Sequence, residues 1–192
     1  MDIDIKGWML GAPAFTKYFR QPSYNRHMMV EQKYPGELAS PQQIQELAEE
    51  YHRAANQLLT LGRPGKPLTR APFRLSALQA IELYLTALLL HRGHNPVQIR
   101  KMQHDLWART EHAVATGLRL RAKTVRHLQT LSQNREYLIT RYGPELAATA
   151  SQINRLTATL DEVAAKVTTL ISQPSRTSQP PAGGQAAADG KV

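Results

Sequence analysis

Hydrophobic and polar positions follow helical spacing from about residue 40 to residue 172. The first helical segment begins at "SPQQ", where Ser40 can cap a helix, Pro41 suits its first turn and Gln43 can reach back to the cap. The stretch "GRPGKP" at 62–67 ends this segment. Between these signals the apolar positions recur three or four residues apart, at Ile44, Leu47, Ala48, Tyr51, Ala55, Leu58 and Leu59.

The same signals predict further helices along the chain. We expect them over about 73–91, 96–103, 106–118, 121–132 and 144–172, with a continuation or a break around "NREYLITRYG". Gly93 should end the helix before it, and Asn95 should cap the short helix that follows. Strand-like alternation is not apparent. The pattern therefore predicts an all-α fold, a helical bundle of about five helices.

The two ends of the chain differ from this helical part. Residues 1–40 are rich in aromatic residues, glycine and proline without clear periodicity, so we expect an irregular N-terminal arm. Residues 173–192 lack an apolar anchor and cannot repay the entropy lost on ordering, so we expect a disordered C-terminal tail. The helical domain should span 41–172.

Two of the predicted helices carry distinctive faces. The helix over 73–91 is apolar around most of its circumference and should be central, with a polar stripe that faces water, a groove or a dimer seam. The stripe comprises Ser76, Gln79, Glu82 and Thr86. The last helix carries a heptad seam that packs within its own bundle or against a second subunit, which would make a homodimer. The seam comprises Leu146, Thr149, Ile153, Leu156, Leu160, Val163, Val167 and Leu170.

Composition and charge limit the cellular compartment and the classes of partner that we expect. The 192-residue chain has a formal net charge of +9 and no cysteine, which favours polyanionic partners and excludes disulfides and thiolate metal sites. Its first residues are acidic, unlike a signal peptide. Its longest apolar stretch, "ALQAIELYLTALLL", is too short and too polar to span a bilayer, which needs about 20 apolar residues. We expect a soluble, cytoplasmic protein without a membrane partner.

The stretch 91–110, "HRGHNPVQIRKMQHDLWART", concentrates candidate chemistry. Asp105 is placed to cap the helix that starts at Leu106. His104 could hydrogen-bond a nearby carbonyl or Glu82 and fix the joint, or it could contact a ligand together with Asp105. Arg92, Arg100, Lys101 and Arg109 make the stretch basic, and Arg119, Lys123 and Arg126 follow on one helical face. If these faces merge, they form a surface for RNA or a nucleotide. No motif for a metal or cofactor is present, because Gly93 prevents His91 and His94 from sharing a face.

The motifs, taken in order, resemble the HEPN domain family of helical bundles. The resemblance rests on "SALQAIELYLTALLLHRG", "HDL" at 104–106 and "RYG" at 141–143, and it covers about residues 45–170. One departure is Thr86, where many members have lysine four residues after the helix glutamate. The resemblance implies either a binding or interaction module, partnered in some members by a nucleotidyltransferase, or a metal-independent RNase of toxin or defence type, which would have an antitoxin.

The RNase branch is marked by an arginine followed, after four to six residues, by histidine. Arg121 and His127 fit this spacing, Arg20 and His27 fit it in the irregular arm, and Arg100 and His104 fall one residue short. About 1.7 matches are expected by chance in a chain with this many arginines and histidines. We therefore interpret the chain as a non-catalytic module that contacts RNA or nucleotide through Glu82, Arg100, Lys101, His104 and Asp105. The alternative is an RNase with Arg121, His127 or His104 as catalytic residues.

Overall fold

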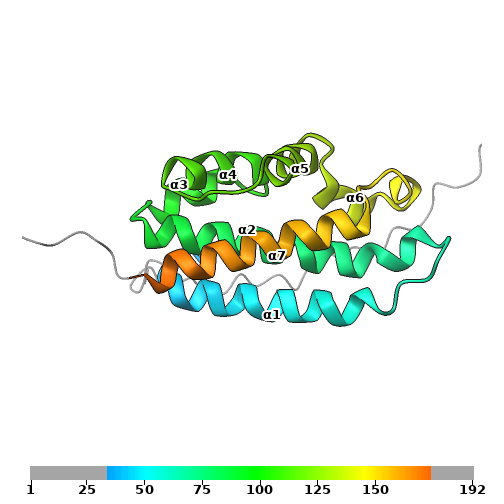
Figure 1. Ribbon diagram of the computed structural model, residues 1–192, viewed down its shortest axis with the longest axis horizontal. Helices are drawn as coiled ribbons and strands as arrows, with labels where there is room; N and C mark the ends of the chain where they lie inside the picture. Colours follow the sequence, from blue (N-terminus) through cyan, green and yellow to red (C-terminus); the bar gives the residue numbers. More distant parts are fainter. Residues whose placement is uncertain (1–33, 174–192) are drawn as a thin grey trace, which may run out of the picture. The chain divides into compact units, whose positions relative to one another are not determined.

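The computed structural model describes residues 34–173, and all regular structure in this range is helical (Figure 1). The prediction of an all-α bundle is thereby confirmed. The expected disordered tail, and most of the expected N-terminal arm, lie outside the described residues. The helices are α1 (Pro41–Leu59), α2 (Ala71–His91), α3 (Pro96–Lys101), α4 (Leu106–Ala115), α5 (Ala122–Gln133), α6 (Glu136–Tyr142) and α7 (Ile153–Ser172), with the 3-10 turns η1 (Pro67–Arg70) and η2 (Pro144–Leu146).

The central helix is α2, as its apolar circumference predicts. It contacts α1, α7, α4 and α6, and eleven of its 21 residues are buried. By length and composition alone, Pro67–His91 could cross a membrane, but 61% of its most apolar window is buried inside the fold. Packing on four neighbouring helices therefore accounts for the apolar composition of this segment.

The other helices lie on two sides of α2 (Figure 1). On one side α1 packs along α2 in the opposite direction, and α7 runs beside both. On the other side α4 contacts α2, and α5 contacts both α4 and α7. The short helix α6 contacts α2 and α5 near the start of α7. This arrangement brings the joints between α3 and α4 and between α5 and α6 to the same side of α2.

Most helix ends follow the local sequence. The capping box is present, because the Gln43 backbone N–H donates to Ser40 Oγ (3.1 Å) and the Ser40 N–H donates to Gln43 Oε1 (2.9 Å). Asn95 caps α3 by accepting from the Val97 N–H at 2.8 Å. Gly93 follows α2 with φ of +82°, a conformation that glycine adopts without steric cost. These three signals are read correctly from the sequence.

The start of the last helix is predicted wrongly. A helix is expected from Pro144, but α7 begins at Ile153, after η2 and a turn. The Ser151 backbone N–H donates to the buried Glu136 carboxylate (2.8 Å), which holds this segment in a non-helical path. Consequently Leu146 is 43% exposed and lies outside the seam. Thr149 also lies outside it, whereas the seam residues Leu156, Leu160, Val163 and Val167 are buried.

The seam of α7 is thus used within the chain, where α7 packs against α2. A homodimer stays a prediction, and it would need another surface. The expected apolar face of α1 also differs, because Leu47 and Tyr51 are 45% and 38% exposed. An edge helix buries only a narrow stripe, here Ile44, Ala48 and Ala55. The range 34–173 contains seven α-helices, where about five are expected. The short helix α3 is predicted, whereas α6 is a separate helix in the segment that the sequence leaves open.

The position of α7 gives a stability test. Leu160 is fully buried, so Leu160→Ala should lower the free energy of unfolding by about 2–5 kcal/mol through lost burial and the cavity left behind. Leu146→Ala, in the same expected seam but outside α7, should change it by less than about 1 kcal/mol. Urea unfolding of both variants measures this difference. Equal losses would place Leu146 in the core and contradict the observed start of α7.

Candidate functional site

The joint between α3 and α4 is built as a capped turn. After α3 ends at Lys101, Gln103 adopts φ of +47°, which is uncommon for a residue other than glycine. The Asp105 carboxylate then accepts from the backbone N–H groups of Trp107 (2.9 Å) and Ala108 (3.1 Å). The predicted capping role of Asp105 is confirmed.

His104, in this joint, bonds to Glu82 of α2, as the sequence allowed. The distance between His104 Nδ1 and Glu82 Oε2 is 3.1 Å. The other carboxylate oxygen of Glu82 lies 3.3 Å from Arg109 Nη2, and Arg109 Nε donates to Thr86 Oγ1 at 3.3 Å. The last two residues of the polar stripe of α2 are therefore turned toward α4.

The opposite ring nitrogen of His104 meets Arg141 of α6. Arg141 Nη1 lies 3.4 Å from His104 Nε2, and the Tyr137 ring is 5.2 Å from the imidazole, centre to centre. A guanidinium can only donate, so Nε2 accepts and the imidazole proton sits on Nδ1, where it is donated to Glu82. We refer to Glu82, His104, Arg109, Tyr137 and Arg141 as the His104 cluster.

The charges of the His104 cluster are divided between an inner and an outer part. Arg109 is 4% exposed and matches the charge of Glu82. Burial lowers the pKa of its guanidinium, although Glu82 and Asp105 oppose this effect. Its Nη1 is buried and has no hydrogen-bond partner among the described residues. The exposed Arg141 and the 40% exposed side chain of His104 remain at the outer part.

The basic stretch 91–110 does not form one merged surface. Arg109, expected to add to it, is buried in its ion pair with Glu82, because α4 packs against α2. Arg100 forms an ion pair with Glu37 (3.4 Å). Lys101 and Arg92 are exposed. Of the five residues expected to bind a ligand, the structure joins Glu82 and His104 directly and uses Asp105 as a cap.

Arg121 and His127, the candidate catalytic pair of the RNase alternative, are engaged separately. Arg121 Nε is 2.7 Å from Glu162 Oε2, and the Arg121 backbone N–H donates to the same carboxylate. Burial alone would raise the pKa of Glu162, but hydrogen bonds from Thr124 and Arg121 outweigh burial and lower it. His127 is 1% exposed, with Nδ1 2.7 Å from Thr159 Oγ1. The imidazole therefore has no open path to a bound substrate.

A basic depression of about 660 Å³ lies between α5 and α7, and we call it the α5–α7 groove. Its cationic lining residues are Arg121, Lys123, Arg126 and Arg155, and its lining contains no carboxylate. Arg155 Nη2 lies 3.5 Å from the Lys123 carbonyl oxygen, so it reaches from α7 to α5. Polar side chains complete the lining: Thr124, Thr130, Gln152, Asn154 and Thr159.

The positive potential of the groove reaches the histidine beneath it. Burial, together with the charges of Arg155 and Arg74, lowers the pKa of His127 to about 4. Thr159 lines the groove and bonds His127, so the imidazole lies directly under the groove wall. Within the described residues, Lys123, Arg126 and Arg155 form no ion pair, which leaves their charge available to a ligand.

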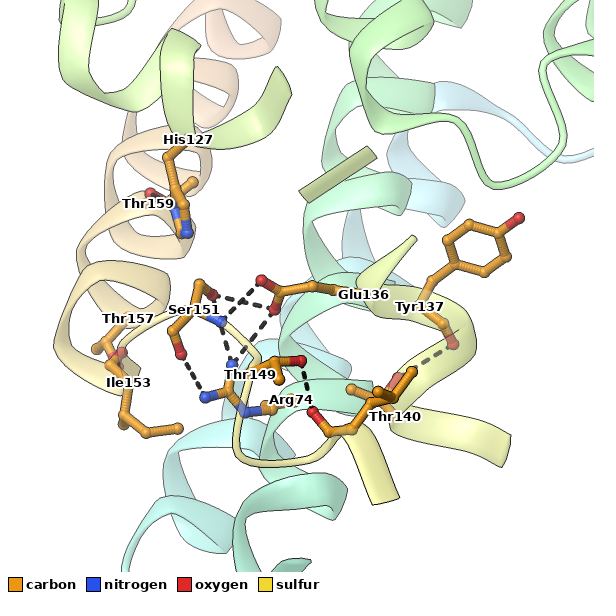
Figure 2. Close-up of polar contacts among 11 residues, drawn as sticks. Arg74, His127, Glu136, Tyr137, Thr140, Thr149, Ser151, Ile153, Thr157 and Thr159 are labelled. Carbon is orange, nitrogen blue, oxygen red and sulfur yellow. Dashed lines mark hydrogen bonds and ion pairs between the residues drawn. The ribbon is translucent and has the colours of Figure 1, made fainter. Parts of the chain in front are cut away.

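A buried polar network fixes the entry to α7 (Figure 2). Arg74 of α2 is 3.4 Å from Glu136 of α6, and both are nearly inaccessible. The Glu136 carboxylate also accepts from the Ser151 N–H (2.8 Å) and hydroxyl (3.0 Å), while Arg74 donates to the Ser151 carbonyl. Burial lowers the pKa of Arg74, an effect opposed by Glu136. Helix α2, helix α6 and the segment before α7 are thus joined by one polar network.

Two arginines that tertiary packing brings to these sites are not predicted from the sequence. Arg141 belongs to the "RYG" motif without a predicted contact, and no motif marks Arg155. Both lie far along the chain from the residues they meet, at separations of 37 residues for His104 and 32 for Lys123. The sequence gives one indication for each: Arg141 lies near a predicted joint, and Arg155 lies on the polar face of a predicted helix.

Comparison with known proteins adds no assignment. No family model, curated protein or solved structure matches the chain.

The buried imidazole predicts a pH dependence of stability. The pKa of His127 is about 4 in the folded chain and about 6.5 when unfolded, so unfolding takes up a proton between these values. Stability should be full above about pH 6.5 and fall by up to about 3 kcal/mol as the pH drops to about 4. His127→Gln should remove this part of the slope in urea unfolding, and His112→Gln, at an exposed position, should retain it. Equal slopes in wild type and His127→Gln would contradict the assignment.

The cap of α4 predicts a smaller effect. Asp105→Ala removes the side-chain acceptor of the Ala108 N–H and one of the two acceptors of the Trp107 N–H, which Ser132 Oγ also accepts, and it should lower the free energy of unfolding by about 1 kcal/mol. Asp105→Asn should recover most of this loss, because asparagine also caps helices well. A loss of ligand binding at unchanged stability would instead make Asp105 a ligand contact.

Proposed function

We propose that this chain is a HEPN-like binding module that contacts RNA through the α5–α7 groove. The observation that carries the proposal is the groove itself, where Lys123, Arg126 and Arg155 line one depression beside Arg121, which pairs with Glu162, and no carboxylate is part of the lining. A flexible single strand can follow such a line of cations, and each neutralised phosphate releases counterions. The net charge of +9 adds long-range attraction for RNA.

The geometry of the motifs supports the HEPN part of the proposal. "HDL" supplies His104, "RYG" supplies Arg141, and the apolar central helix supplies Glu82. These three segments are separate in the sequence, yet their polar side chains meet at His104. A common contact for the three motifs explains why they would occur together and in this order.

The α5–α7 groove favours binding over cleavage. Its lining contains no histidine, aspartate or glutamate, so it offers no side chain suited to move a proton near neutral pH. His127 lies beneath the groove, but it is buried, uncharged near neutral pH and bonded to Thr159. The RNase alternative built on Arg121 and His127 therefore loses the exposed imidazole that it requires.

The proposal predicts a salt dependence carried by particular residues. Affinity for a single-stranded RNA should fall steeply as salt rises, and the slope should decrease by about two units when three cations are removed. The test variant combines Lys123→Ala, Arg126→Ala and Arg155→Ala. The control variant combines Arg100→Ala and Lys101→Ala, since Arg100 already pairs with Glu37. Fluorescence anisotropy at several salt concentrations measures both slopes.

Two outcomes would contradict this proposal. If Arg100→Ala with Lys101→Ala flattens the slope and the groove variant does not, RNA binds at the joint between α3 and α4. If the protein cleaves RNA in the presence of a chelator and His127→Ala abolishes cleavage, the RNase alternative holds. We expect that neither the wild type nor His127→Ala cleaves the RNA.

A further inference from the structure

The outer part of the His104 cluster presents two nitrogen groups toward each other with no carboxylate between them. His104 Nε2 and Arg141 Nη1 are 3.4 Å apart, and the residues come from the joint between α3 and α4 and from α6. The guanidinium and the imidazole hold each other poorly, because the contact between them is a long hydrogen bond from a cation to a neutral ring nitrogen. An oxyanion that accepts from both would be a better partner for each.

The chain bends in an unfavourable way to make this pair. Gln103 (φ +47°) and Arg135 (φ +50°) are the non-glycine residues with positive φ within 34–173. Gln103 directly precedes His104, and Arg135 directly precedes α6, which carries Tyr137 and Arg141. Left-handed conformations at such residues cost free energy, about 1–3 kcal/mol each, and they concentrate where function requires a fixed geometry.

We propose that Arg141 and His104 bind the terminal phosphate of a nucleotide or of a 5′-phosphorylated RNA. This inference rests on the proposed function and names a part of the ligand that the α5–α7 groove does not select. Arg141 would donate to the phosphate oxygens through its planar guanidinium. His104 would take a proton from solvent at Nε2 and donate it as a second hydrogen bond, replacing its contact with Arg141.

The inner part of the cluster fits this role. Glu82 holds the Nδ1 proton of His104, so it is a positioning residue that keeps Nε2 directed toward Arg141. Arg109 matches the charge of Glu82, so the carboxylate does not repel an incoming anion at full strength. With a neutral His104, the sum over Glu82, Arg109 and Arg141 is one positive charge, and protonation of His104 makes it two.

A terminal phosphate suits this arrangement better than a phosphodiester. A phosphate monoester carries a charge of about −1.5 to −2 near neutral pH, whereas a diester carries one negative charge. The Arg141 guanidinium and, once protonated, His104 Nε2 would both donate to one point, which matches a single group of higher charge. The cations of the α5–α7 groove are distributed over two helices and match a backbone instead.

Calorimetry of the full-length chain with 5′-AMP and with adenosine tests the inference. We expect 5′-AMP to bind and adenosine to bind at least tenfold more weakly. Titration in two buffers of different ionisation enthalpy should show proton uptake on binding of 5′-AMP. A merely structural His104 would take up no proton.

Variants assign the effect to the pair. Arg141→Gln should lower the affinity for 5′-AMP at least tenfold, and Arg92→Gln, at an exposed arginine outside the cluster, should leave it unchanged. His104→Gln should abolish proton uptake while 5′-AMP still binds through Arg141. Far-ultraviolet circular dichroism should show all three variants folded, since Arg141 and Arg92 are exposed and His104 is half-buried.

Oligonucleotides separate this inference from the proposed function. A 5′-phosphorylated RNA should bind more tightly than the same RNA with a 5′-hydroxyl, and Arg141→Gln should remove the difference. If the two RNAs bind equally to wild type, or if inorganic phosphate and 5′-AMP give no binding at millimolar concentration, the terminal-phosphate site is wrong. RNA binding in the α5–α7 groove would still be tested independently, by the salt dependence of the affinity.

Discussion

The buried ion pair between Arg74 and Glu136 is the constraint on which both candidate binding regions depend. Glu136 is fully buried, and its oxygens are satisfied by Arg74 and by the backbone and hydroxyl of Ser151. Removing one partner of such a pair leaves an uncompensated charge and costs about 3–5 kcal/mol. The network fixes α6 against α2 and fixes the start of α7. Arg141 lies on α6 and Arg155 on α7, so one network places a cation of each region.

Two further ion pairs engage arginines within the fold and so limit the cations that are open to a ligand. Arg109 and Glu82 neutralise each other between α4 and α2, and Glu162 engages Arg121 at the start of α5. The positive charges behind the net charge of +9 are therefore not distributed evenly over the surface. Cations that pair internally organise the fold, while Lys123, Arg126 and Arg155 remain for a polyanion. The lining of the α5–α7 groove has a single sign because it contains these cations and Arg121 but no carboxylate.

Sequence alone predicts features whose causes are local, and it fails where the cause is tertiary. Ser40, Asn95 and Asp105 act as caps because each side chain accepts from a backbone N–H that lies within three residues. The contact of His104 with Glu82 was foreseeable from a polar stripe beside a joint. The late start of α7 was not, because a buried carboxylate 15 residues earlier in the chain accepts the Ser151 N–H. Local helix signals contain no information about that acceptor.

The two histidines singled out by sequence motifs have opposite surroundings, and this contrast separates their possible roles. His127 lies under cations, is 1% exposed, and its pKa is lowered to about 4, so it stays neutral near pH 7. His104 contacts a carboxylate on one nitrogen and a guanidinium on the other, and 40% of its side chain is exposed. Solvent can deliver a proton to His104 but not to His127 without opening the core. The proposed proton-coupled binding of an anion therefore requires the pair that tertiary packing creates, His104 with Arg141, rather than the arginine and histidine that are close in sequence.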